Sequence, residues 1–372
     1  MKDRGNGGGN RKKGNNSRKV NQRRKASTST AVGGAPPTRI THSCESVNSV
    51  DEQQSVAAKS ERDKPEKPLD NSIFFEFVRR ALEKKPIGLR AEFLAMKRSN
   101  DFSVMTAFVA ANEKGQNRYK DVGCLDNCRV TLGTPWPHDY IHANYVSTPS
   151  RPKKFICTQA PMEKTCADFW FMCLSERVEI IMMLCNFIEK GANKCWKYFP
   201  EYKETMTFTE GPQKILVKCT RVKNLSWGES KLKESTFYVE GVGKTMKIKH
   251  IHWIDWPDRC VPSPDMTVIK ILDRYRSKNP IVVHCSAGIG RTGSVVMIEY
   301  ILEQLESHEK ITPSDEILLK IRKQRNNSVQ TEHQYLFVHQ VILNYLLKKK
   351  YLDEHGDRLI REFYEEYKKV VV

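Results

Sequence analysis

The 372-residue sequence predicts an α/β fold in which one large domain takes up most of the chain. Short β-branched runs alternate with turn residues between positions 129 and 184, and further strand-like stretches follow up to position 283. Segments with apolar residues at helical spacing lie before, between and after these runs. Mixed strands flanked by helices, without an internal repeat, indicate a single unit of about 280 residues.

The first helix is expected from about residue 70, where the sequence changes from polar to periodically apolar. Asn71 or Ser72 is suited to cap this helix, and Pro86-Ile87-Gly88 should break it. Further helices are expected at residues 89–96, 166–175, 266–276, 293–305 and 332–347. Strands are expected at residues 129–132, 140–141, 154–156, 179–183, 214–217, 236–239, 246–253 and 280–283.

Residues 1–68 nearly lack large apolar side chains, so they cannot bury enough surface to offset the entropy of ordering. We expect a disordered basic N-terminal tail here, a folded domain at 69–350 and a helical extension at 351–372. The net charge is +18, and the first 30 residues hold ten lysines and arginines against one aspartate. The basic clusters at 11–13 and 23–25 fit nuclear import, a nucleic-acid contact, an anionic-membrane contact or a solvated tail without a single partner.

Several classes of protein are disfavoured. The most apolar stretch, Val178 to Cys185 with Glu179 inside it, is far shorter than the roughly 18 residues of a membrane span, and the N-terminus lacks a secretory signal. Eleven cysteines without repeated spacing fit a reducing compartment. Cys124 and Cys128 have no second pair at zinc-finger spacing, so we expect no metal site. We therefore expect a cytoplasmic protein that its basic tail could direct to the nucleus.

The most informative segment runs from Ile281 to Gly293. An apolar strand leads into Cys285, then into a loop with two glycines and Arg291, and then into a helix. Backbone N–H groups converge in such a loop and the helix N-terminus adds positive charge, so the segment predicts an anion-binding site. The same groups stabilise negative charge on a cysteine sulfur, and an arginine fork binds two phosphoryl oxygens at once. The pattern predicts nucleophilic attack on phosphorus, against the alternative of a buried structural cysteine followed by a glycine turn.

This segment resembles the active-site loop of the protein tyrosine phosphatases. Trp256-Pro257-Asp258 resembles the mobile acid loop of the tyrosine-specific branch, and residues 117–122 resemble its phosphotyrosine-recognition loop. Residues 330–335 resemble the loop that positions the hydrolytic water, and Glu189 matches the glutamate that orients the catalytic arginine. The resemblance covers about residues 70–350. It implies a single catalytic domain with a mixed, highly twisted central β-sheet flanked by helices, without a cofactor or metal.

The resemblance also implies roles for individual residues. Cys285 would attack phosphorus, Arg291 would bind the phosphoryl group together with the loop, and Asp258 would act as general acid and then as general base. Gln330 would place the water, Thr292 would hydrogen-bond the departing thiolate, and His284 would tune the surroundings of the cysteine. The substrate-binding set would comprise Tyr119, Asp121, Glu189, Trp256, Ser286, Ala287, Gly288, Ile289, Gly290, Arg291 and Gln334.

Four positions depart from the family pattern. Cys260 stands where glycine is usual after the acid loop, and His142, Ala160 and Ser328 replace an asparagine, a glycine and a methionine. We expect these changes to affect rate and loop dynamics rather than the reaction.

The leading hypothesis is a non-receptor, tyrosine-specific protein phosphatase that acts on phosphotyrosyl proteins as a monomer in signal transduction. One alternative is a catalytically weak or inactive phosphotyrosine-binding module. Another is a nucleic-acid-associated protein, which the lack of interleaved aromatic residues in the tail disfavours.

Overall fold

The computed structural model describes residues 72–227, 230–307 and 310–371. The basic tail expected at 1–68 lies outside the described residues, as do Asn71 and the side chain of Ser72, the two candidate helix caps. Within the described ranges, no helix is long and apolar enough to cross a bilayer. All ten cysteines of these ranges are free.

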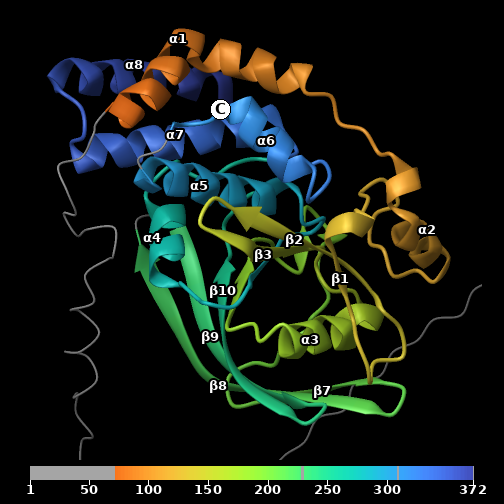
Figure 1. The fold of residues 1–372 in the computed structure, drawn as a ribbon. Coiled ribbons are helices and arrows are strands. Elements are labelled where there is room, and N and C mark those ends of the chain that lie inside the picture. The colour runs from red at the N-terminus through yellow and green to blue at the C-terminus, as the bar shows by residue number, and fades with distance from the viewer. Residues whose placement is uncertain (1–71, 228–229, 308–309, 372) are drawn as a thin grey trace, which may run out of the picture. The chain divides into compact units, whose positions relative to one another are not determined.

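A twisted, nine-stranded mixed sheet forms the centre of the described domain (Figure 1). Its order is β1 (Arg129–Thr131), β2 (Tyr140–Thr148), β3 (Arg151–Thr158), β11 (Ile281–His284), β4 (Ile180–Met183), β10 (Lys244–Trp253), β9 (Ser230–Gly241), β8 (Gln213–Trp227) and β7 (Thr205–Glu210). The mixed α/β fold is thereby confirmed. Strand β7 was not predicted, and its residues alternate between exposed and half-buried.

Four neighbouring strands, β3, β11, β4 and β10, run parallel. All four residues of β11 are buried, as expected for a central parallel strand covered on both faces. The register pairs His284 with Thr158 and with Met183, so these strands end at the same edge of the sheet. Segments that follow such ends lie close together in space, which is where ligand sites of open α/β sheets form.

Helices cover both faces of the sheet (Figure 1). The helix α3 (Cys166–Ser175) lies on one face, and α5 (Gly290–Ser307) and α7 (Glu332–Lys349) lie on the other. The remaining helices are α1 (Ser72–Ala95), α2 (Thr106–Glu113), α4 (Thr267–Arg274), α6 (Ser314–Arg322) and α8 (Glu354–Val371). Neither α2 nor α6 was predicted.

The break predicted at Pro86 is confirmed. Lys85 has non-helical angles (φ 56, ψ 170) inside α1, because the residue before a proline is sterically excluded from the helical region.

The helical layer continues beyond residue 350. Ile360, Phe363 and Tyr367 of α8 are buried in the same hydrophobic core as α1 and α7. At the start of this region Tyr351 stacks on Phe74, with ring centroids 4.5 Å apart. A helix is thus present in the region of the predicted extension, and its apolar side packs against the domain.

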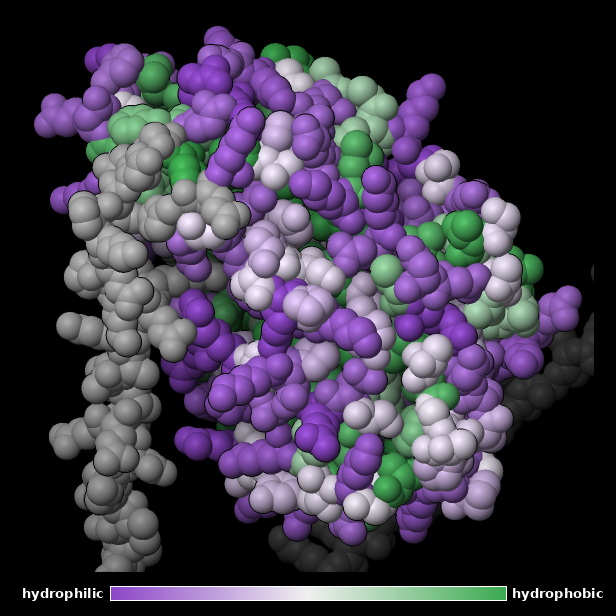
Figure 2. Space-filling view, in the orientation of Figure 1, coloured by the Kyte–Doolittle hydropathy of each residue, from purple (hydrophilic) through white to green (hydrophobic). Residues whose placement is uncertain are grey.

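The face of the molecule in Figure 2 is mostly hydrophilic, with hydrophobic residues in small groups. One group lies over the α2 region, where Phe102, Val104 and Val109 are 44–48% exposed. These groups are small, so we place no extended apolar docking surface on this face.

Burial lowers the pKa of five histidines. It lowers the pKa of His142 and His284 to about 3, of His252 and His339 to about 4, and of His250 well below the ordinary value. The hydroxyl of Tyr198 lies 2.7 Å from Nε2 of both His250 and His284, which joins two of these neutral rings.

These histidines predict an acid-labile fold. Each histidine has a folded-state pKa below its unfolded value of about 6.5. Its contribution to the free energy of unfolding is therefore fully present above pH 6.5 and is lost as the pH falls toward 3–4. Burial raises the pKa of Asp168 to about 6, which offsets a small part of the loss. We expect the free energy of unfolding to fall by about 1 kcal/mol per histidine between neutral pH and about pH 5.5. Urea unfolding at a series of pH values measures this, and an unchanged midpoint would contradict it.

Candidate active site

The loop between β11 and α5 is shaped by two close approaches. Gly288 has φ +70, and a Cβ atom there would lie 2.0 Å from the carbonyl oxygen of Thr158, so only glycine fits. A Cβ atom at Gly293 would lie 2.5 Å from the backbone nitrogen of Val329. Val329 in turn donates its N–H to the Ile289 carbonyl at 2.9 Å, which brings Gln330 beside the loop. Cys285 begins this loop and is 4% exposed.

Arg325 fixes the orientation of the loop peptides from behind. This fully buried guanidinium donates to the carbonyl oxygens of Ala287 and Gly288, at 3.1 Å each. Because the N–H of a trans peptide points opposite to its C=O, the N–H groups of Gly288 and Ile289 point away from Arg325. Arg325 was not among the predicted site residues, since it reaches the loop through backbone carbonyls 37 and 38 residues away in the sequence.

Arg291 lies in the first turn of α5 and is 3% exposed. Its Nη1 and Nη2 donate to the two carboxylate oxygens of Glu189 at 2.6 and 2.7 Å. Burial opposes the charge of Arg291, but the hydrogen bond to Glu189 and the electrostatic effects of Cys285, Cys185 and Glu189 outweigh it, so the pKa of Arg291 is raised. These two parallel hydrogen bonds hold the permanently charged guanidinium of Arg291 at the edge of the sheet.

Asp258 lies in the same cleft as Cys285 and contacts two cations. Its Oδ1 accepts from Nη2 of Arg291 at 3.1 Å, and its Oδ2 lies 2.9 Å from Nζ of Lys194. Burial alone would raise the pKa of Asp258, but the hydrogen bond from Lys194 and the charge of Arg291 outweigh it, so this pKa is lowered.

Lys194 was missed by sequence reasoning. It follows a tight hairpin of β5 (Ile188–Glu189) and β6 (Ala192–Asn193). Lys190 and Gly191 at its turn both have positive φ. The Lys-Gly pair is a turn signal that could have shown the chain returning toward Glu189.

The predicted recognition loop forms one wall of the cleft. The hydroxyl of Tyr119 lies 2.8 Å from Oγ of Ser286, which donates to the carbonyl of Lys194 at 3.1 Å. Asp121 is exposed and also lines the cleft. Gln330 donates its backbone N–H to the side chain of Gln334 at 2.9 Å, and both glutamines also line the cleft.

The cleft encloses about 560 Å³ of empty space, open solvent included. It brings together the predicted site residues Tyr119, Asp121, Asp258, Cys285, Ser286, Ala287, Gly290, Arg291, Gln330 and Gln334, with Val122, Lys194 and Arg259 in addition.

Six predicted site residues do not line this cleft: Glu189, Trp256, His284, Gly288, Ile289 and Thr292. Trp256 is 1% exposed and packs on Trp253 and Phe337, and only its carbonyl reaches the site, where it accepts from Arg291 at 3.2 Å. Its ring therefore contributes to packing. His284 is fully buried and neutral.

The departures from the family pattern are accommodated by local contacts. His142 accepts from Arg325 at 3.1 Å through Nδ1, so its Nε2–H donates to the Val122 carbonyl at 2.8 Å. Ser328 donates to the Arg325 carbonyl, and the backbone N–H of Ala160 donates to the Ser286 carbonyl. In the acid loop the positive φ falls on Arg259 (φ 61), so residue 260 does not need the freedom of glycine.

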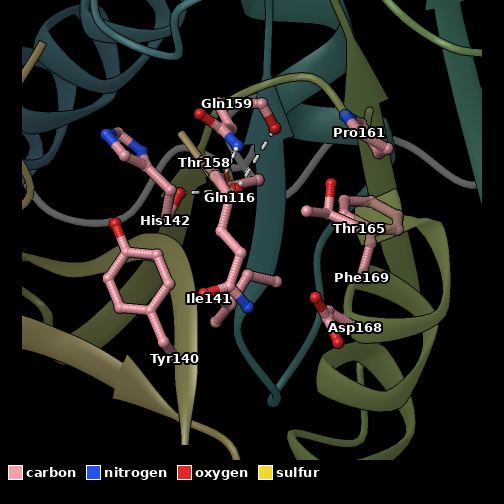
Figure 3. Close-up of a pocket in the computed structure, with 10 residues that line it drawn as sticks. All are labelled: Gln116, Tyr140, Ile141, His142, Thr158, Gln159, Pro161, Thr165, Asp168 and Phe169. Atoms are coloured by element: carbon pink, nitrogen blue, oxygen red, sulfur yellow. Dashed lines mark hydrogen bonds between the residues drawn. The ribbon is translucent and has the colours of Figure 1, made fainter. Parts of the chain in front are cut away.

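A second, smaller cavity is lined by residues that contact the recognition loop, among them His142 and Gln159 (Figure 3). In it, Nε2 of Gln159 donates to the Gln116 carbonyl at 2.9 Å, and Oγ1 of Thr158 donates to the His142 carbonyl at 2.9 Å. Oε1 of Gln159 also accepts the N–H of Arg118 at 2.8 Å. Together with His142, these contacts hold the recognition loop at both of its ends.

Comparison with known proteins identifies relatives of this domain. A family model described as protein-tyrosine phosphatase matches residues 113–344. Human receptor-type tyrosine-protein phosphatase zeta is 35% identical over 261 residues, which cover 66% of this chain and 11% of that protein. The Lar-like tyrosine-protein phosphatase of Caenorhabditis elegans is 32% identical over 265 residues, which cover 69% of this chain and 12% of that protein. This chain thus spans about a tenth of the length of these curated relatives.

Solved structures resemble the domain as well. The catalytic domain of human protein tyrosine phosphatase non-receptor type 18 aligns with a TM-score of 0.60 and 26% identity, over 74% of this chain and 99% of that one. PTPN18 in complex with HER2-pY1196 phosphopeptides aligns with a TM-score of 0.61 and 26% identity, over 73% of this chain and 98% of that one. The family match spans the residues that build the cleft around Cys285, and the chain belongs to the protein-tyrosine phosphatase family.

Proposed function

We propose that this chain hydrolyses phosphotyrosine in proteins through a cysteinyl-phosphate intermediate. The observation that carries the proposal is one cleft lined by Cys285, Arg291 and Asp258, with the arginine held by Glu189. A nucleophile, an anion-binding fork and a carboxylic acid are the groups that phosphoryl transfer to a thiolate needs.

In the first step, Arg291 and the N–H groups of residues 286–290 bind the phosphoryl oxygens. The sulfur of Cys285 attacks phosphorus in line with the tyrosyl oxygen, so that the S–P bond forms as the P–O bond breaks. Asp258 gives its proton to the departing tyrosyl oxygen, because a phenol leaves more readily than a phenolate.

Asp258 is ionised in the substrate-free arrangement, since Lys194 and Arg291 hold its pKa low. A bound phosphate dianion engages Arg291 and adds negative charge beside the carboxylate. Both changes favour the protonated acid, so substrate binding supplies the general acid that the first step needs.

In the second step, Gln330 and Gln334 place a water against phosphorus, and the Asp258 carboxylate accepts its proton. The S–P bond breaks and phosphate leaves. The buried Oγ1 of Thr292 has no hydrogen-bond partner among the described residues, which supports a bond from this hydroxyl to the departing thiolate of Cys285. His284, joined to Tyr198, supports the strand end that carries Cys285.

Selectivity for tyrosine follows from the cleft wall. Tyr119, hydrogen-bonded to Ser286, offers an aromatic face to the substrate ring, while the exposed carboxylate of Asp121 can accept backbone N–H groups of a peptide.

Comparing kcat/KM on a phosphotyrosyl and a phosphoseryl peptide tests the proposed phosphotyrosine hydrolysis. Equal rates on the two peptides, or no turnover of either, would contradict it; the latter result would favour the phosphotyrosine-binding module.

We further propose that the protein is a monomeric, non-receptor enzyme that acts in signalling in the cytoplasm or nucleus. The basic clusters at 11–13 and 23–25 support a contact of the tail with an anionic partner.

Removing residues 1–68 should leave kcat and KM on a short, uncharged phosphotyrosyl peptide within about twofold, and should change the localisation of the protein. A large rise in kcat/KM on removal would instead identify the tail as an inhibitor.

Replacing the nucleophile separates chemistry from binding. Cys285→Ser should abolish turnover and retain phosphopeptide binding, because Arg291 and the loop N–H groups remain. Steady-state kinetics and calorimetry measure the two properties. Turnover above roughly a tenth of wild type would argue against covalent catalysis at this position.

Replacing the acid should show in the pH profile. We expect Asp258→Ala to lower kcat by roughly 10²-fold and to remove the limb of the profile that the carboxyl supplies. An unchanged limb would mean that another group donates the proton.

The Lys194→Met variant tests whether the lysine lowers the pKa of the general acid, Asp258. Without the lysine the pKa of Asp258 should rise, which moves the base-side limb of kcat/KM to higher pH. A shift to lower pH, or no shift, would show that Lys194 does not control the acid.

A further inference from the structure

The active-site cleft contains a cation that the proposed reaction does not use. Arg259 directly follows Asp258, is exposed, and lines the same cleft as Tyr119, Asp121 and Gln330. The other two cations of the cleft are engaged, since Arg291 is paired with Glu189 and Lys194 with Asp258. Within the part of the chain that the structure describes, the Arg259 side chain forms no ion pair or hydrogen bond, although its charge contributes to the lowered pKa of Asp258.

The backbone at Arg259 is strained. Its φ of 61 lies in the left-handed region, which disfavours residues with a Cβ atom and is usually taken by glycine or asparagine. Strained positions near active sites persist where the geometry has a use. At Arg259 this backbone conformation coincides with an exposed, charged side chain that lines the active-site cleft.

We propose that Arg259 is a specificity-determining residue that selects phosphotyrosyl peptides with a carboxylate side chain next to the phosphotyrosine. The proposal rests on the proposed phosphotyrosine hydrolysis. The phosphoryl group of such a substrate occupies the cleft base, where Arg291 binds it, so a flanking side chain lies at the mouth, which Arg259 lines. A guanidinium without a partner there attracts a carboxylate and repels a lysine or arginine.

The second charged group at the mouth does not cancel this preference. Asp121 also lines the cleft, but it is not within ion-pair distance of Arg259 in the described residues. Its carboxylate is suited to the backbone N–H groups of a peptide, which every substrate offers. Lys120, between Tyr119 and Asp121, is exposed but does not line the cleft, so Arg259 is the exposed cation among the cleft-lining residues that distinguishes one flanking side chain from another.

A substrate carboxylate that binds Arg259 also affects the acid loop, because Arg259 belongs to that loop. The neighbouring Asp258 carboxylate and the Trp256 carbonyl both accept hydrogen bonds from Arg291, so the acid loop as observed is held against the phosphate-binding arginine. A substrate carboxylate bound to Arg259 holds the loop in this arrangement, with the acid beside the leaving oxygen. An acidic flanking residue is therefore expected to raise kcat as well as to lower KM.

The test uses the full chain and phosphotyrosyl peptides with glutamate, glutamine or lysine next to the phosphotyrosine, on either side. We expect kcat/KM to be about twofold to fivefold higher with glutamate than with glutamine on at least one side, the scale of a solvent-exposed ion pair. The ratio should fall to near one in Arg259→Gln and at high salt. It should reverse in favour of the lysine peptide in Arg259→Glu.

Lys244→Gln is the matched control, because it removes the same charge from the exposed start of β10, outside the cleft. The glutamate preference should survive in it. A wild-type ratio near one, or a preference that persists in Arg259→Gln, would overturn the proposal. Binding of the same peptides to Cys285→Ser gives the ratio without turnover, so failure of hydrolysis is distinguished from failure of the Arg259 proposal.

Discussion

The buried ion pair between Arg291 and Glu189 is the interaction on which the rest of the site depends. The two side chains are 3% and 9% exposed, so both charges are largely removed from water. Such a pair is favourable only with good geometry, here two hydrogen bonds of 2.6 and 2.7 Å. That geometry requires the first turn of α5 and the β5–β6 hairpin to be fixed relative to each other. The common edge of β3, β11, β4 and β10 fixes them, because each strand ends directly before a segment of the site.

The same guanidinium links phosphate binding to acid catalysis. Besides Glu189 it contacts the Trp256 carbonyl and the Asp258 carboxylate, so the acid loop rests on the group that binds the substrate. Lys194 completes this arrangement and extends it through its carbonyl to Ser286 and Tyr119. The loop that begins at Cys285, the acid loop and the recognition loop are thus joined by one continuous set of polar contacts. A substrate that takes the place of Asp258 on Arg291 is expected to change the protonation of the acid.

Much of this could be predicted from the sequence, because the informative signals are local. The strand before Cys285, the glycines after it and the break before Pro86 each follow from neighbouring residues. The contacts of Arg325 could not be predicted in this way, since it meets His142 across 183 residues and the loop carbonyls across 37 or 38. Lys194 was missed because only the hairpin turn brings it to Asp258. Trp256 was assigned to substrate binding by its place in a motif, whereas its ring packs against Trp253 and Phe337.

The most direct test of the account is a double-mutant cycle on the central pair, measured as kcat/KM on a phosphotyrosyl peptide. Glu189→Gln should lower kcat/KM by at least about tenfold, since it leaves Arg291 buried without its counter-charge. In an Arg291→Lys background, which has already lost the two-pronged fork, the same replacement should cost less than about twofold. Circular dichroism of all four proteins establishes that each is folded. Equal losses in both backgrounds would show that Glu189 acts independently of Arg291 and would contradict the account.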